Sequence, residues 1–429
     1  MLAVLANSWA LLLGILLLLI GNGLQGTLLG VRGAIEGFDA ATMSLVMSAY
    51  YLGFLAGSRY VSELILRVGH VRVFAALASL VSAAFILYGA SPHPVYWVLL
   101  RLLVGFCFAG IYVVAESWLN QSASNETRGQ ALSLYMITQS AGIISAQAFL
   151  NLANPADYDL FILISVLVSI SFLPILLSPS RAPVFHTARR MSLFQLYRIS
   201  PLGCVGMMLL GGILSATFGM AAVFGTEKGL SVAEISVFVG AIYVGALVLQ
   251  YPIGRISDHM DRRVLIITLT ALGAVLTMAG VLSGQDIVVL TIVAFGIGGI
   301  SNPLYSLLIA YTNDFLDHAD MTAASGGLLF LNGLGAITGP LVIGWMMTAY
   351  GADAFFVFIA VLFALIALYG IWRSTRRAAP PVTATAPYAP VMPTASPVAL
   401  EVAQEVAIER ATAAENATED ERESSKEDA

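Results

Sequence analysis

Residues 353–372 read "DAFFVFIAVLFALIALYGIW", a run of twenty residues in which Asp353 carries the only formal charge. A helix needs about 20 mainly apolar residues to cross a hydrocarbon layer that is ~30 Å thick. Residues 160–177, "LFILISVLVSISFLPILL", form a second run of this kind. Backbone polar groups in lipid must be satisfied within the segment, and the alternating pattern of a barrel strand is absent. Both runs therefore predict transmembrane helices.

The composition of the whole chain agrees with this prediction. The 429 residues are 58 % hydrophobic and 11 % charged, and the mean hydropathy is +0.86. The mean hydropathy lies far above that of a soluble domain, and a soluble protein with this composition would lack enough polar residues to cover its surface. We expect an all-α integral membrane protein with twelve transmembrane helices. The predicted spans are residues 8–30, 43–66, 71–91, 95–118, 129–150, 158–178, 201–225, 233–254, 263–283, 286–312, 321–348 and 353–373.

A weak internal repeat divides these spans into two six-helix halves. "GIYVVAESWL" (110–119) aligns with "GISNPLYSLL" (299–308), and "QSAG" (139–142) aligns with "NGLG" (332–335). Parallel halves of a transporter fold produce such a repeat. The predicted parts are an N-terminal half (1–178), a central cytoplasmic loop (179–200), a C-terminal half (201–373) and a disordered acidic cytoplasmic tail (374–429).

The basic residues predict the orientation of the chain. If the N-terminus is cytoplasmic, the inner segments before residue 378 hold fourteen arginines, whereas the outer loops hold only Arg32 and Lys228. This bias follows the positive-inside rule. We expect a multi-pass protein of the cell (inner) membrane with both termini in the cytoplasm. The tail explains the negative net charge of the protein. Residues 378–429 carry a net charge of −7, whereas the whole chain carries −6.

The loop "YPIGRISDHMDRR" (251–263) concentrates charge between two apolar runs. Arg262 and Arg263 obey the positive-inside rule, but topology gives no reason for an acid at Asp258. Asp258 lies four residues after Gly254, so it can pair with Arg262 or face a helix N-terminus of the other half. We predict that these four residues form a conformational latch, closed in one state and released in another.

A second charged group is predicted at the same inner face. Glu116 lies near the inner end of span four, about 22 Å along the helix from Arg101, so these two side chains cannot pair. Glu116 could instead meet Arg67 or Arg72. This pairing favours a part in the latch over a proton site.

Twelve spans, a long central loop and the signature of Gly254, Asp258, Arg262 and Arg263 resemble the major facilitator superfamily, over residues 1 to about 377. Asp261 departs from the signature, which usually has a second Gly there. The loop "RVGHVRVF" (67–74) and "AESWLN" (115–120) resemble a bacterial subgroup of YcaD-like transporters. "RLLVGFCFAG" (101–110) is similar to the Arg-x-x-x-Gly motif of the family, and this similarity implies a part for Arg101 in proton coupling.

Intramembrane polar residues supply candidate binding groups. Arg101 must face protein or water and find a partner, unless it snorkels toward the outer headgroups. The polar residues near the middle of cavity-lining spans either contact substrate or form interhelical hydrogen bonds. The candidate substrate contacts are Asn22, Gln25, Gln139, Asn302, Tyr305 and Asn332.

Together these observations predict a secondary active transporter that moves a small solute by alternating access. An ion gradient would drive it, since the sequence contains no phosphate-binding loop for ATP. We expect proton coupling, with export favoured over import. The alternative is a non-transporting membrane sensor or scaffold that acts through its tail. We expect a monomer in the lipid bilayer, no enzyme activity, no cofactor, no metal site and no nucleic-acid partner.

Overall fold

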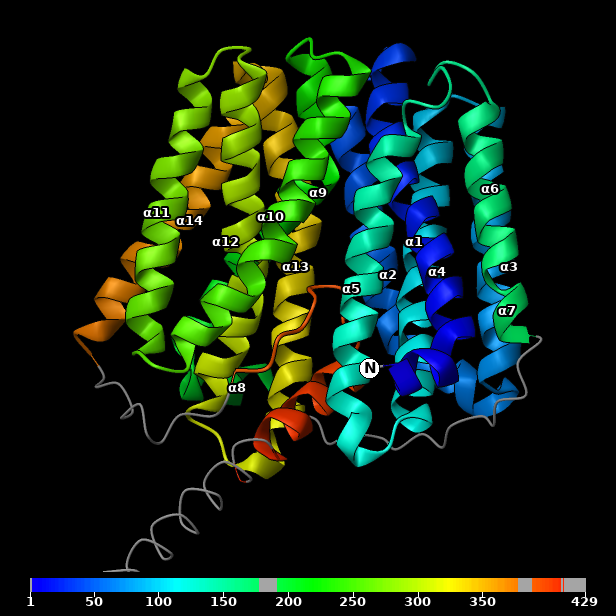
Figure 1. The fold of residues 1–429 in the computed structure, drawn as a ribbon. Helices are drawn as coiled ribbons and strands as arrows, with labels where there is room; N and C mark the ends of the chain where they lie inside the picture. Colours follow the sequence, from blue (N-terminus) through cyan, green and yellow to red (C-terminus); the bar gives the residue numbers. More distant parts are fainter. Residues whose placement is uncertain (1, 177–190, 377–387, 410–411, 413–429) are drawn as a thin grey trace, which may run out of the picture.

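The computed structural model describes residues 2–176, 191–376, 388–409 and 412, and these residues form helices and connecting turns (Figure 1). The first group of helices is α1 (Leu2–Ile35), α2 (Ala40–Val68), α3 (His70–Ala90), α4 (Pro94–Ser122), α5 (Asn125–Phe149), α6 (Asp159–Ser171) and α7 (Leu173–Leu176). The second group is α8 (Leu193–Ile199), α9 (Pro201–Glu227), α10 (Val232–Ser257), α11 (Arg262–Leu282), α12 (Ile287–Asn313), α13 (His318–Tyr350) and α14 (Ala354–Ser374).

The helices account for the twelve predicted spans. Among the described residues, ten helices are long and apolar enough to cross a membrane. The eleventh is α5, which has 25 residues but a more polar composition. The twelfth consists of α6, with 13 residues, and the short α7 that follows it. The all-α membrane fold predicted from the sequence is therefore confirmed.

The two groups of helices lie side by side, with α1–α7 on one side of the bundle and α9–α14 on the other (Figure 1). Inside each group the helices touch through glycines in the same way. A Cβ atom on Gly53 of α2 would overlap the carbonyl of Leu102 in α4, and one on Gly245 of α10 would overlap the carbonyl of Phe295 in α12. In the predicted repeat, the pair α2 and α4 corresponds to α10 and α12. Close approach of backbones at small residues is the usual packing of membrane helices.

The bundle has two distinguishable ends. We call the end with the α2–α3, α4–α5, α10–α11 and α12–α13 turns the basic end, and the other the opposite end. At the opposite end the two groups touch directly. The N–H of Ala41 donates to Oγ1 of Thr348 at 3.1 Å, and Nδ2 of Asn151 donates to Oγ of Ser236 at 3.0 Å.

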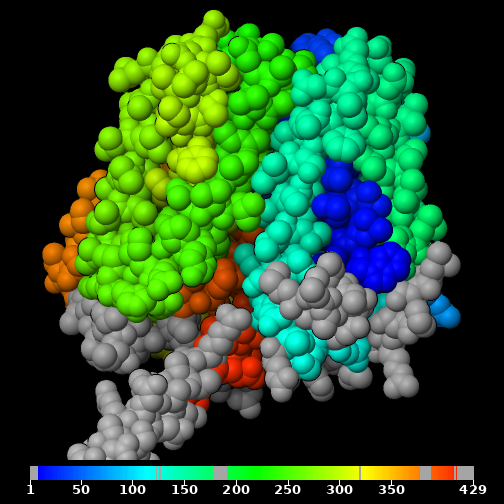
Figure 2. All heavy atoms as spheres, in the orientation of Figure 1, coloured from blue at the N-terminus to red at the C-terminus, as the bar shows by residue number. Residues whose placement is uncertain are grey.

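The tail differs from the sequence prediction. The sequence predicts disorder over residues 374–429. In the structure, residues 388–396 form a non-helical segment with one turn at 393–394, called the extended segment below, and residues 397–409 form a helix. Both pack at the basic end between the two groups of helices, where the tail is red in Figures 1 and 2. Much of the predicted central loop lies outside the described residues, and its last part contains the short helix α8.

Candidate functional site: a cavity between the two helix groups

A cavity of about 720 Å³ lies between the two groups of helices. Side chains from α1, α2, α4 and α5 line one side of it, and side chains from α9, α10, α12 and α13 line the other. At the basic end its lining extends to Asp258 and His259, and the tail contributes residues between 388 and 394. The lining thus reaches the basic end, whereas at the opposite end the two groups of helices contact each other directly.

Arg101 of α4 places a cation at the wall of this cavity. Arg101 is only 6 % exposed, and its guanidinium donates a hydrogen bond to Oε1 of Gln25 in α1. The same group lies 4.8 Å from the centroid of the Tyr50 ring, within the range of a cation–π interaction. Its second terminal nitrogen lies 3.4 Å from Sδ of Met47. Arg101 therefore faces the protein interior and does not snorkel to the headgroups.

Aromatic side chains form much of the remaining wall, and sequence reasoning missed them. They are Tyr50, Tyr51, Phe54, Tyr112, Phe218 and Tyr243. The rings of Phe218 and Tyr243 stack with centroids 4.8 Å apart, which joins α9 to α10. Aromatic residues are common on every face of a membrane helix, so nothing in the sequence distinguishes these from residues that face lipid.

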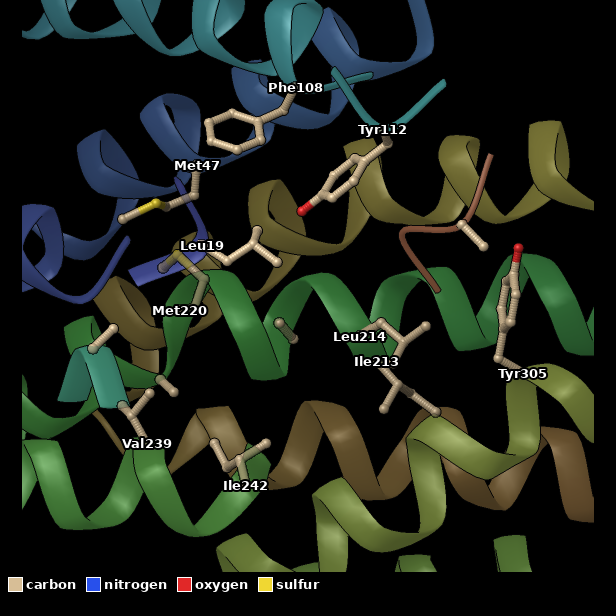
Figure 3. Close-up of a cluster of buried hydrophobic side chains, with 14 of the residues drawn as sticks. Leu19, Met47, Phe108, Tyr112, Ile213, Leu214, Met220, Val239, Ile242 and Tyr305 are labelled. Atoms are coloured by element: carbon tan, nitrogen blue, oxygen red, sulfur yellow. The ribbon is translucent and has the colours of Figure 1, made fainter. Parts of the chain in front are cut away.

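A cluster of buried apolar side chains packs around α9 beside the cavity (Figure 3). Leu19, Met47 and Tyr112 come from the first group of helices, and Leu214 and Ile242 come from the second. The two groups thus share one apolar core at this level.

The predicted polar contacts divide into two sets. Asn22, Asn302 and Asn332 line the cavity. Gln25, Gln139 and Tyr305 are buried but do not belong to its lining. Gln25 lies behind the wall because its side chain binds Arg101.

Two of the lining asparagines also form interhelical hydrogen bonds. Nδ2 of Asn302 donates to Oε1 of Gln250 at 3.2 Å, and Nδ2 of Asn332 donates to the carbonyl of Met207 at 3.2 Å. These two side chains therefore form interhelical hydrogen bonds and also line the cavity, so both explanations apply to them.

The α10–α11 turn holds a buried ion-pair network. The side chain of Arg262 is only 1 % exposed, and its guanidinium pairs with the carboxylate of Asp314 at the end of α12. Its other terminal nitrogen lies 3.4 Å from Oδ1 of Asp258, so the predicted pairing of these two residues is present. Arg263 is also buried, at 4 % exposed. All these residues belong to the second group of helices, and Gly254 lies just before them at the end of α10.

Asp258 contacts the tail. Its Oδ1 accepts a hydrogen bond from the backbone N–H of Tyr388 at 3.0 Å. The ring of Tyr388 packs on Gly254, where an added Cβ would lie 2.5 Å from the ring. Burial raises the pKa of the Tyr388 phenol well above its usual value. The phenol stays neutral and accepts a hydrogen bond from Nε2 of Gln250 at 3.1 Å.

The expected pairing of Glu116 with Arg67 or Arg72 is wrong for this structure. Glu116 is 3 % exposed, and both arginines are exposed at the ends of α2 and α3. One oxygen of its carboxylate accepts from the hydroxyl of Tyr135 in α5 at 3.3 Å. The other accepts from the backbone N–H of Ser396 in the tail at 2.9 Å. The inward direction of this side chain, toward α5 and the tail, keeps it from the two arginines.

The described residues offer no obvious place for a metal ion. Within them, no three His, Cys, Asp or Glu side chains gather closely enough to hold one. The cavity instead presents amides, the guanidinium groups of Arg101 and Arg255, and aromatic rings, which are groups that bind an organic solute through hydrogen bonds and stacking.

Comparisons with known proteins agree with this arrangement. A family model described as Major Facilitator Superfamily matches residues 8–222 and 202–408. A protein of Escherichia fergusonii named uncharacterized MFS-type transporter YcaD is 25 % identical over 378 residues, which are 87 % of this chain and 97 % of that protein. A protein of the same name from Escherichia coli is 24 % identical over 82 % of this chain and 91 % of its own length.

Two solved transporters have a similar fold. The nucleoside transporter NupG, as its D323A mutant, superposes with a TM-score of 0.76 at 16 % identity, covering 85 % of this chain and 99 % of NupG. A bacterial homolog of the human lysosomal transporter Spinster, in an inward-facing and unoccupied conformation, has a TM-score of 0.61 at 14 % identity. That comparison covers 93 % of this chain and 97 % of the homolog.

Proposed function

Because the chain belongs to the major facilitator superfamily, we propose that it is a secondary active transporter that moves a small solute across a membrane by alternating access. The observation that carries this proposal is the cavity of about 720 Å³, which both groups of helices line and which the contacts at the opposite end close on one side. Alternating access requires such a site at the interface of two halves that can rock against each other.

We propose that the basic end faces the cytoplasm of a bacterial cell, with both termini on that side. The excess of arginines in the turns and segments of this end supports the orientation. The structure then corresponds to an inward-facing state of a monomer. The six-plus-six division of the helices, at the boundaries predicted from the sequence, is part of the same proposal.

The cavity wall suggests the kind of solute. Stacked and tilted aromatic rings suit a planar or partly apolar body, and the amides of Asn22, Asn302 and Asn332 suit polar substituents. The guanidinium of Arg101 adds a fixed positive charge, because an arginine does not release its proton in proteins. We propose a small polar organic solute, with proton coupling in which Arg101 takes part and export as the favoured direction.

Flux measurements test this proposal. The full-length protein in liposomes with an imposed pH gradient is offered a panel of labelled solutes that includes nucleosides, because a transporter of similar fold carries them. We expect flux of at least one solute, its loss in the Arg101→Ala variant, and unchanged flux in the exposed control variant Arg72→Ala. Equal flux in both variants would contradict the part assigned to Arg101.

The sensor or scaffold hypothesis gives a different outcome. It predicts no flux of any solute in the panel, together with loss of the cellular phenotype when residues 378–429 are deleted. A transporter whose tail has no recruiting role predicts flux in the same deletion variant.

A further inference from the structure

The cavity mouth at the basic end contains a segment of the chain itself. From Tyr388, where the described part of the tail begins, the chain runs between the two groups of helices as far as Ser396 and continues as a helix over residues 397–409. Figure 2 shows this segment at the boundary between the two groups. We propose that residues 388–409 are an intramolecular ligand of the inward-open cavity, which blocks its mouth and prevents the two groups from closing there.

The contacts of the extended segment have the character of a binding site. The N–H of Tyr388 donates to Asp258, and the N–H of Ser396 donates to Glu116. Between them, Val391 forms two bonds with the same hydroxyl, because its N–H lies 3.0 Å and its carbonyl oxygen 3.1 Å from Oγ of Ser306. Buried backbone groups are costly unless they are paired, and here side chains of the bundle pair them.

Prolines reduce the number of backbone groups that need a partner. The sequence of the segment is "YAPVMPTASP" over residues 388–397, with a proline at every third or fourth position from Pro390 to Pro397. A proline has no N–H, and its fixed φ favours an extended chain with little entropy to lose. The proline-rich composition of this segment therefore suits a peptide that binds in a narrow space.

The tail helix has one apolar face and one acidic face. Ala399, Val402, Ala403 and Val406 are all less than 10 % exposed, whereas Glu405 and Glu409 are exposed. Leu400 is the most buried of its apolar residues, at 1 % exposed. The helix therefore docks through its apolar face, and its acids remain at the surface.

Two polar contacts hold the docked helix on both sides of the mouth. Oε2 of Glu405 lies 3.0 Å from Nη1 of Arg128 in α5, and Nε2 of Gln404 donates to Oγ of Ser325 in α13 at 2.8 Å. The extended segment joins the same two sides, because Glu116 belongs to α4 and Ser306 to α12. The segment lies in the space that must close when the opposite end opens.

The tail also reaches the binding cavity. Tyr388, Met392 and Thr394 belong to the cavity lining. The phenol of Tyr388 accepts from Gln250, whose amide oxygen accepts from the lining residue Asn302. The segment therefore occupies space that a solute entering from the basic end would use.

A peptide-binding experiment tests the proposal on the full-length chain. In the Leu400→Asp variant the apolar face of the tail helix carries a charge, so the tail should leave its site. We expect a synthetic peptide of residues 388–409 to bind this variant saturably and to bind the wild-type protein and the exposed control variant Glu409→Ala at least tenfold more weakly. The absence of saturable binding up to about 1 mM, the order of effective concentration for two groups linked in one chain, would overturn the proposal. Equal binding to all three proteins would overturn it as well.

A spin-label experiment tests the effect on conformation. Nitroxide pairs at the exposed positions Leu66 and Val264 report on the basic end, and pairs at Leu152 and Leu282 report on the opposite end. In the Leu400→Asp variant we expect a new population with a shorter distance at the basic end and a longer one at the opposite end. The peptide should remove that population. Distance distributions identical to those of the wild type would overturn the claim that the tail prevents closure.

This inference rests on the proposed function in one respect, since it assumes that the protein works by alternating access. Neither experiment requires a transported solute. Absence of flux with every solute would therefore count against the proposed function and leave the peptide result intact.

Discussion

The carboxylate of Glu116 in α4 accepts a hydrogen bond from the backbone N–H of Ser396 at 2.9 Å, across 280 positions of the chain. The contact joins the part of α4 near the basic end to the point where the extended segment of the tail becomes a helix. The second oxygen of the same carboxylate binds the hydroxyl of Tyr135, which fixes its direction. These two bonds direct the Glu116 carboxylate toward α5 and the tail, and away from Arg67 and Arg72.

We predict that the Glu116→Gln variant weakens tail binding. The carboxyl group accepts from Tyr135 through one oxygen and from Ser396 through the other, whereas an amide has a single oxygen, so the glutamine side chain cannot accept both bonds in this way. In the Leu400→Asp background the affinity for the peptide of residues 388–409 should fall about tenfold, which corresponds to ~1.4 kcal/mol. Isothermal titration measures this change. An unchanged affinity would show that Glu116 does not contribute to the site, and the exposed Glu63→Gln variant is the control.

The two acids beside Arg262 should differ in their effect on stability. Asp314 and Arg262 are both almost fully buried at their side chains, whereas the side chain of Asp258 is 42 % exposed. Removing one member of a buried pair leaves a charge without compensation and costs about 3–5 kcal/mol, but an exposed pair contributes only about 0–1 kcal/mol.

Thermal unfolding in detergent checks this contrast. The melting temperature should fall by several degrees in Asp314→Asn and change little in Asp258→Asn. Asp258→Asn should instead weaken peptide binding, because Asp258 accepts from the tail. A large loss of stability in Asp258→Asn would contradict the assignment of these two roles.

We also predict that Gln25 and Arg101 are coupled. Gln25 is fully buried and accepts from the Arg101 guanidinium, so Gln25→Leu leaves a buried cation with one acceptor fewer. The double variant Gln25→Leu, Arg101→Met removes both groups and should be less destabilised than the sum of the single variants. Melting temperatures of the four proteins form the cycle that measures this coupling. Strict additivity would contradict it.

Hydropathy alone predicted most of the fold. The run at 353–372 became α14, and the two runs around the loop at 251–263 became α10 and α11. The limits of the spans follow from the thickness of a bilayer, which sets the length of each apolar run. No comparable rule predicts which side chain binds a charged group inside the membrane. The contact between Arg101 and Gln25 joins two helices 76 positions apart, and only the assembled bundle shows it.

The tail shows where composition misleads. An Ala- and Pro-rich linker before an acidic end predicts a solvated chain, because it has too few large apolar residues for a core of its own. The apolar side chains of the tail pack instead against the core of the bundle. A signal was present, since residues 399, 402, 403 and 406 follow the spacing i, i+3, i+4, i+7 of one helical face. The acids at 405 and 409 lie on the exposed side of that helix.

Close glycine contacts predict a clear effect of added side chains. A Cβ at Gly298 of α12 would overlap the carbonyl of Ile242 in α10, and backbone cannot move as a flexible side chain does. Gly298→Ala should therefore lower the melting temperature by several degrees or abolish expression of the folded protein. Gly326→Ala in α13 is the matched control, because an added Cβ meets nothing within 4 Å there. Equal stability of the two variants would contradict the close packing of α10 on α12.

The orientation of the bundle can be tested from its turns. His93 lies in the turn between α3 and α4 at the opposite end, and His259 lies in the turn between α10 and α11 at the basic end; both are exposed. The native residues Cys107 and Cys204 are buried, so they should react slowly. In intact cells a membrane-impermeant maleimide should label the His93→Cys variant and spare the His259→Cys variant until the cells are opened. The reverse pattern would place the tail outside the cell, where it could not block the inner mouth of the cavity.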